Sequence, residues 1–126
     1  MSGGNAAAGE AIAGLLFLAR AFPQRLIAQR EHRWLQLRRD KAPADVEGQT
    51  VLIAGGGAAA AEVARFVQAL AMQVSVAVRD DAHAPEPFDV LLARAQWLII
   101  VADDAPRLHA QRIALLPRGA QIVNVA

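Results

Sequence analysis

Four short and almost continuously apolar runs divide the chain from residue 50 onward. These runs are Thr50 to Ala54, Gln73 to Val78, Trp97 to Val101 and Gln121 to Val125. Runs of this length and composition are typical of strands buried in a parallel sheet. The segments between the runs favour helices, from Gly57 to about Leu70, from Phe88 to Ala95, and around Leu108, Ile113, Leu115 and Leu116.

This alternation of strand and helix predicts an α/β fold. We expect a Rossmann-like parallel sheet of about four strands, with flanking helices and right-handed crossovers. The expected spatial order is second, first, third and fourth strand. That order places the topological switch point between the strands Thr50–Ala54 and Trp97–Val101, and a ligand should bind at their carboxyl ends.

A long helical segment precedes the sheet. Asn5 can cap a helix that runs to about Ala21, and Pro23 can open a second helix that continues from Gln24 to Arg39. Pro43 and Gly48 make residues 40–48 a connecting loop. We therefore expect residues 1–49 to form an N-terminal helical segment and residues 50–126 to form the α/β core.

The first helix carries a wider apolar stripe than one surface helix needs. Its apolar positions are Ala8, Ala11, Ile12, Leu15, Leu16, Leu18, Ala19 and Phe22. Either this helix lies on the sheet alone, or another subunit covers part of it. The second interpretation predicts a homodimer through residues 6–34, with Leu15 and Leu18 in the contact and Trp34 as an anchor. The competing route to self-association is the exposed edge of the fourth strand.

Three glycines follow the first strand and precede an alanine-rich helix. Read as G-x-G-x-x-A, this fingerprint is Gly55, Gly57 and Ala60. Gly55 allows a sharp turn, Gly57 leaves room for a phosphate at the main chain, and Ala60 keeps the helix close to the strand. We expect the main-chain N–H groups of Gly57, Ala58, Ala59 and Ala60 to bind an anion such as a pyrophosphate. Strand, glycine turn, helix and strand in about thirty residues are typical of a dinucleotide-binding unit.

Composition excludes several other chemistries. The 126 residues suit one small domain, and the net charge of +1 indicates no attraction to nucleic acid. The arginines of the N-terminal segment fit a solvated helix face better than a nucleic-acid patch. The absence of cysteine excludes disulfides and thiolate sites, and the three histidines lack metal-ligand spacing. The apolar run Ile12 to Leu18 is too short to span a membrane, so we expect no membrane partner and a cytoplasmic location.

The order of motifs resembles the coenzyme-binding domain of the D-isomer-specific 2-hydroxyacid dehydrogenases, a family that includes glyoxylate/hydroxypyruvate reductases. The resemblance covers about Asn5 to Ala126. It rests on Ala19 to Pro23, Gln29-Arg30 with Arg33-Trp34, Gly48 to Val51 with the glycine turn, Asp89 to Ala93, and Leu116 to Ala126. It implies reversible hydride transfer between a nicotinamide cofactor and a 2-oxo or D-2-hydroxy acid.

Two departures from the family pattern concern the cofactor. The family's acidic residue at the end of the second strand falls on Val78, and Arg79 follows it. An acid there holds the ribose 2′-hydroxyl, whereas an arginine accommodates a 2′-phosphate, so we expect NADP or NAD with NADP slightly favoured. The segment from Ala102 to Pro106 is shorter than the family's loop, and Ala102 and Asp103 are placed in the cofactor site by the resemblance.

The resemblance assigns no catalytic residue to this sequence. The family's substrate-binding arginine comes directly after the Val-Asn-x-Ala strand end, and its glutamate and histidine come later, whereas the sequence ends at Ala126. We therefore expect no dehydrogenase activity from these residues alone. The alternatives are a non-catalytic Rossmann module that has lost the chemistry, and a flavin- or S-adenosylmethionine-binding protein, which fits the glycine turn but not the flanking motifs.

Overall fold

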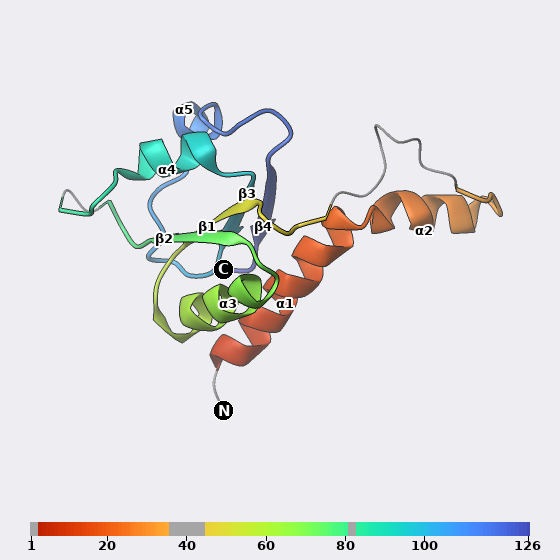
Figure 1. The fold of residues 1–126 in the computed structure, drawn as a ribbon, viewed down its shortest axis with the longest axis horizontal. Helices are drawn as coiled ribbons and strands as arrows, with labels where there is room; N and C mark the ends of the chain where they lie inside the picture. The colour runs from red at the N-terminus through yellow and green to blue at the C-terminus, as the bar shows by residue number, and fades with distance from the viewer. Residues whose placement is uncertain (1–2, 36–44, 81–82) are drawn as a thin grey trace.

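The computed structural model describes residues 3–35, 45–80 and 83–126, and it shows an α/β fold built on a four-stranded parallel sheet (Figure 1). The strands are β1 (Thr50–Ala54), β2 (Gln73–Ala77), β3 (Trp97–Ile100) and β4 (Gln121–Asn124). Their order in the sheet is β2-β1-β3-β4, with every neighbouring pair parallel. The predicted fold class and strand order are therefore confirmed.

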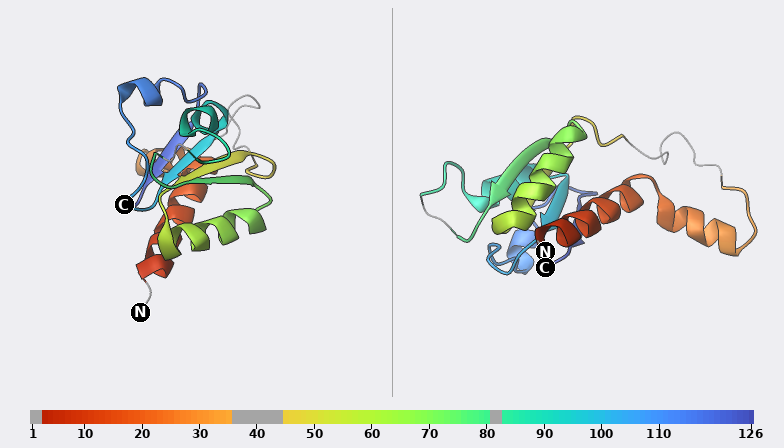
Figure 2. Two further views of the ribbon diagram at one scale, coloured as in Figure 1. Left: turned by 90° about the vertical axis from the view of Figure 1, so that its left-hand side faces the viewer. Right: turned by 90° about the horizontal axis from the view of Figure 1, so that it is seen from below.

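Five helices are present in the described part of the chain. They are α1 (Gly3–Ala19), α2 (Phe22–Arg30), α3 (Gly57–Ala69), α4 (Phe88–Arg94) and α5 (Ala110–Ile113). Helices α1 and α3 pack side by side below the sheet, and α4 and α5 lie on the opposite side (Figures 1 and 2).

The two faces of β1 point into two separate hydrophobic clusters. Val51 and Ile53 pack with α1 and α3, whereas Leu52 and Ala54 pack with α4. Successive side chains of a strand point to opposite faces, so both sets are buried when helices cover both faces. This arrangement explains why β1 and β3 are continuously apolar in sequence.

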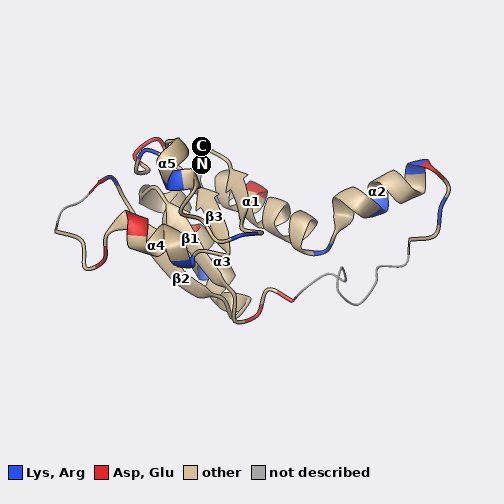
Figure 3. Cartoon of the chain, turned by 90° about the horizontal axis from the view of Figure 1, so that it is seen from above, with Lys and Arg blue, Asp and Glu red and all other residues tan. Residues whose placement is uncertain are grey.

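Helix α1 belongs to the core of this chain, which corrects one part of the dimer hypothesis. Leu15 is fully buried and packs in the cluster that joins α1, α3 and the sheet. Gly14, which precedes Leu15 in the helix, lies against Val123 of β4. Apart from Glu10, α1 carries no charged residue, and Figure 3 shows it almost entirely tan. Leu15 is therefore a core residue and was wrongly expected to lie in a subunit contact.

Helix α2 is shorter than the sequence predicted. It ends at Arg30 instead of Arg39, because Glu31 closes it and His32 adopts a left-handed conformation with a φ of 53°. The predicted helical residues 36–39 and most of the predicted loop, residues 40–44, lie outside the described residues. Helix α2 extends away from the sheet and carries exposed Phe22, Leu26 and Ile27 (Figure 1).

Helix α5 is also shorter than expected. It spans only Ala110–Ile113, with Leu108 before it and Leu116 after it, and both leucines pack against the α4 side of the sheet. His109 is its N-cap: the ring accepts a hydrogen bond from the N–H of Arg112, with Nδ1 3.3 Å from that nitrogen. Leu108 and Leu116 are half-buried and lie in the segments that flank α5, whereas Ile113 of the helix is exposed, so the buried positions of this stretch do not follow a helical period.

No single helix of the described residues is long and apolar enough to cross a membrane; α1 and α2 meet the length and composition criteria only as a pair bent by 68°.

Candidate dinucleotide-binding site

The site begins where β1 ends in the glycine turn. Gly55 has a φ of +116°, and a Cβ built there would lie 2.8 Å from the backbone nitrogen of Ala102. Contacts this short do not occur for real Cβ atoms, so only glycine fits between the ends of β1 and β3. The turn expected at Gly55 is thus present, and its physical reason is the close approach of Ala102.

Gly57 opens α3 and faces free space. Its φ is +82°, and a Cβ at this position would have no heavy atom within 4 Å. No side chain caps the start of α3, so the N–H groups of its first turn, including those of Ala58 and Ala59, point outward without a side-chain acceptor. Ala60 is buried against the sheet. An anion can therefore approach the positive end of this helix directly.

Gly56 is held by a residue that the sequence did not predict. Its N–H donates to the carboxylate of Asp104, with nitrogen and Oδ1 2.9 Å apart. A Cβ at Gly56 would lie 3.2 Å from Asp104 Oδ2 and 3.2 Å from Val78 Cγ2. Asp103 was chosen from the sequence instead of Asp104. The two adjacent aspartates after the third strand indicated that a carboxylate could lie at this position. The sequence does not show which of the two faces the glycine turn.

The end of β2 lies beside the same turn. Val78 is exposed, and Arg79 follows it in a left-handed conformation with a φ of 58°. The N–H of Arg79 donates to the carbonyl oxygen of Asp104 over 2.8 Å. The structure therefore brings Gly56, Val78 and Arg79 together with Asp104.

Asp80 is engaged elsewhere, by Arg112. This guanidinium also pairs with Asp89, donates to the carbonyl oxygen of Arg107 and lies 5.0 Å from the centre of the Phe88 ring. Hydrogen bonding to Arg112 holds the pKa of Asp80 below its usual range. The negative charge of Asp80 is thus largely compensated by Arg112.

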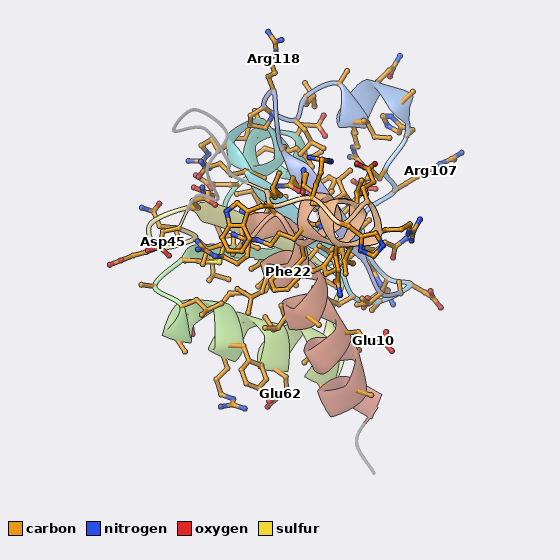
Figure 4. The ribbon with its side chains drawn as sticks, turned by 90° about the vertical axis from the view of Figure 1, so that its right-hand side faces the viewer. Glu10, Phe22, Asp45, Glu62, Arg107 and Arg118 are labelled. Atoms are coloured by element: carbon orange, nitrogen blue, oxygen red, sulfur yellow. The ribbon has the colours of Figure 1, made fainter. Side chains whose placement is uncertain are left out.

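Two cavities adjoin these residues. A cavity of about 510 Å³ lies between the ends of β2 and β3, lined by Arg79, Asp80, Asp103, Asp104 and the turn that leads to Arg107. Arg107 itself extends outward from the molecule (Figure 4). The larger cavity, about 970 Å³, follows β2 from Ser75 to Asp80 and does not include the glycine turn. The smaller cavity does not include the glycine turn either; the larger is lined by Val78 and Arg79 and the smaller by Arg79 and Asp103, so both adjoin part of the predicted site.

The predicted site residues fall into two groups. Gly55, Ala60 and Ala102 shape the turn from within, whereas Gly57, Ala58, Ala59, Val78, Arg79 and Asp103 are at least partly accessible around it. In the described residues, no group of three or more histidine, aspartate or glutamate side chains is arranged to hold a metal ion. The open backbone at Gly57 and the uncapped helix fit a pyrophosphate.

A parallel β-turn-α-β unit with an uncapped helix start at the switch point defines the class of dinucleotide-binding α/β domains. Residues 12–126 match the profile of the D-isomer specific 2-hydroxyacid dehydrogenase, NAD binding domain. The chain belongs to this family, as its resemblance indicated. No curated protein matches the sequence.

Several solved structures share this fold. The TT0316 protein from Thermus thermophilus is 25% identical, with a TM-score of 0.76, over 96% of this chain and 42% of its own. A D-isomer specific 2-hydroxyacid dehydrogenase from Xanthobacter autotrophicus Py2, solved with NADPH and MES, is 25% identical. The match has a TM-score of 0.76 and covers 98% of this chain and 41% of that protein. The pyruvate reductase of Chlamydomonas reinhardtii is similar in fold, with 18% identity and a TM-score of 0.79. The match covers 100% of this chain and 40% of that protein. The chain spans about two fifths of the length of these proteins.

Proposed function

We propose that this chain binds a nicotinamide dinucleotide as part of an oxidoreductase that acts on D-2-hydroxy acids or 2-oxo acids. The observation that carries the proposal is the open backbone at Gly57, at the start of an uncapped helix. A phosphate can approach there without meeting a side chain, and the helix dipole favours its negative charge. When bound, the cofactor would supply the hydride-transfer chemistry.

The substrate part of the proposal rests on family membership. The Xanthobacter protein is a 2-hydroxyacid dehydrogenase, and the Chlamydomonas protein is a pyruvate reductase. A small 2-oxo acid of the glyoxylate or hydroxypyruvate type is the substrate class we propose for the whole enzyme. These 126 residues supply the cofactor side of that reaction.

The choice between cofactors depends on two residues with opposite effects. Arg79, whose guanidinium can bind a 2′-phosphate, supports the expected preference for NADP(H), and the Xanthobacter protein was solved with NADPH. The Asp104 carboxylate beside the glycine turn opposes a further negative charge. Arg79 and Asp104 thus favour opposite cofactors, the expectation of NADP(H) from the sequence is untested, and direct titration with both cofactors decides between them.

Titration of the chain with NADH, followed by calorimetry, tests dinucleotide binding. Gly57→Val should weaken binding at least about tenfold, because a branched side chain would occupy the phosphate position. Gly119→Val is the matched control. Gly119 also has a positive φ, 84°, and open space around it, but it precedes β4 at the other end of the sheet.

The two variants introduce a similar backbone strain. A difference between their affinities for NADH therefore results from the position of Gly57 in the binding site. Binding that is unchanged in Gly57→Val, or lost equally in both variants, would contradict the proposed phosphate position. A wild-type chain that binds neither NADH nor NADPH would refute the function itself.

A further inference from the structure

Asp104 places a carboxylate at the mouth of the glycine turn. This residue comes from the turn after β3, yet its Oδ1 accepts a hydrogen bond from the N–H of Gly56 between β1 and α3. Its side chain thus crosses from one side of the switch point to the other. A carboxylate that lies at this crevice will be next to any ligand bound on the start of α3.

Backbone hydrogen bonds hold Asp104 in place. Its carbonyl oxygen accepts from the N–H of Arg79 over 2.8 Å, and the N–H of Ala105 donates to the carbonyl oxygen of Ala102 over 3.2 Å. Together with the bond to Gly56, these contacts tie the turn after β3 to the ends of β1 and β2. The carboxylate is therefore preorganised and needs no rearrangement to meet a ligand.

The carboxylate lies where the end of β2 lacks an acid. In dinucleotide-binding domains an acidic residue near the end of the second strand accepts a hydrogen bond from the ribose 2′-hydroxyl. Here that strand continues into Val78, which has no polar group. A Cβ at Gly56 would be 3.2 Å from both Asp104 Oδ2 and Val78 Cγ2, so the two side chains converge on the same backbone position.

We propose that Asp104 binds the adenosine ribose in place of an acid on β2 and thereby favours NAD(H) over NADP(H). This inference rests on the proposed function. A ribose 2′-hydroxyl can donate to the free lone pairs of the carboxylate, whereas a 2′-phosphate would meet it as a like charge.

The surrounding charges support this assignment. Asp80 is paired with Arg112, so its charge is compensated, whereas the Asp104 carboxylate accepts from a neutral backbone N–H. Asp103 lines the same cavity and adds a second negative charge. Arg79 and Arg107 line this cavity too; both are exposed, and neither forms an ion pair among the described residues. The Asp104 carboxylate is therefore the charged group that is fixed beside the glycine turn, whereas the two guanidinium groups are exposed and not tied to it.

Calorimetric titration of the 126-residue chain with NADH and with NADPH tests the proposal. Asp104→Asn removes the charge and keeps an oxygen that can accept from the N–H of Gly56. It should shift the ratio of the two dissociation constants toward NADPH by about tenfold, the size expected from one hydrogen bond to a charged group. The shift should combine weaker NADH binding with stronger NADPH binding. Asp45→Asn is the control, since it removes the same charge from an exposed residue that precedes β1, at the opposite end of the sheet, and it should shift the ratio by less than about threefold.

Each outcome is decisive. A wild-type preference for NADPH, or an unchanged ratio in Asp104→Asn, overturns the ribose assignment while the proposed function stands. An equal gain for both cofactors also overturns it, because the carboxylate would then only repel the pyrophosphate. If neither cofactor binds to the wild type, the proposed function fails, and this inference fails with it. Thermal unfolding checks each variant, and Asp104→Ser, whose hydroxyl can also accept from Gly56, repeats the test if Asp104→Asn does not fold.

Discussion

Gly14 of α1 lies so close to Val123 of β4 that a Cβ on Gly14 would be 2.9 Å from Val123 Cγ1. Because Gly14 has no side chain, α1 can pack closely against the sheet beside α3. Gly9, on the same helix, faces open space, with no heavy atom within 4 Å of a Cβ built there. Two glycines of one helix therefore have different roles, one in packing and one without a packing constraint.

We expect alanine at these two positions to change stability in opposite directions. Gly9→Ala should stabilise the protein by roughly 0.5–1 kcal/mol, because alanine has the higher helix propensity. Gly14→Ala gains the same propensity but should be net destabilising by about 1–2 kcal/mol, because overpacking forces Val123 or the helix to move. Denaturant unfolding of both variants measures the difference. Equal stabilisation by both would show that α1 does not pack on β4 in this way.

The ion pair between Asp80 and Arg112 predicts a dependence of stability on pH. The pKa of Asp80 is lowered from its ordinary value of 3.8 by the hydrogen bond with Arg112. A lowered pKa in the folded state adds stability above the unfolded pKa, and this stability is lost as the pH falls through the folded pKa. Wild type should therefore be more stable than Asp80→Asn at about pH 7, and the difference should decline as the pH falls below 3.8.

Thermal unfolding of wild type and Asp80→Asn between about pH 7 and about pH 2.5 checks this expectation. Asp45→Asn is a suitable control, because Asp45 is exposed and no ion pair to it is present among the described residues. A stability difference between wild type and Asp80→Asn that stays constant over this range would contradict the role of Arg112.

Self-association through the N-terminal helices is the third prediction, in a form revised by the burial of Leu15. The exposed apolar side chains of this segment are Phe17, Phe22, Leu26, Ile27 and Trp34. Phe17 and Phe22 stack with ring centres 5.9 Å apart, and Trp34 is 88% exposed. An apolar surface of this kind often marks an interface, and a two-fold contact would use the same surface on both copies.

We expect dimers of the wild-type chain in sedimentation experiments at tens of micromolar, a range typical of weak interfaces. The double variant Leu26→Glu, Ile27→Glu should be monomeric, because it places charge in the centre of the contact. Val90→Glu, on the exposed face of α4, introduces charge at a similarly exposed apolar residue and should leave the dimer intact. A monomeric wild type would rule out this interface, and dimers of the double variant would point to the β4 edge.

Local pattern was sufficient for the sheet and for the glycine turn. Continuous apolar runs specify buried strands, and the spacing of Gly55, Gly57 and Ala60 is confined to one short segment of chain. Helix ends were less predictable. Helix α2 ends at Arg30 because His32 takes a left-handed conformation. The presence of a histidine in a polar stretch does not predict this conformation.

Composition and periodicity by themselves determined the fold class and the position of the anion-binding turn, because these depend on residues that are close in sequence, and the strand order followed from the rules for alternating strands and helices. Only the tertiary structure decided that Leu15 points into the core, that Gly14 meets Val123, and that Asp104 instead of Asp103 reaches Gly56. Each of these contacts joins segments that are far apart in sequence. Their geometry is set by how helices and strands pack, and a local pattern carries no information about it.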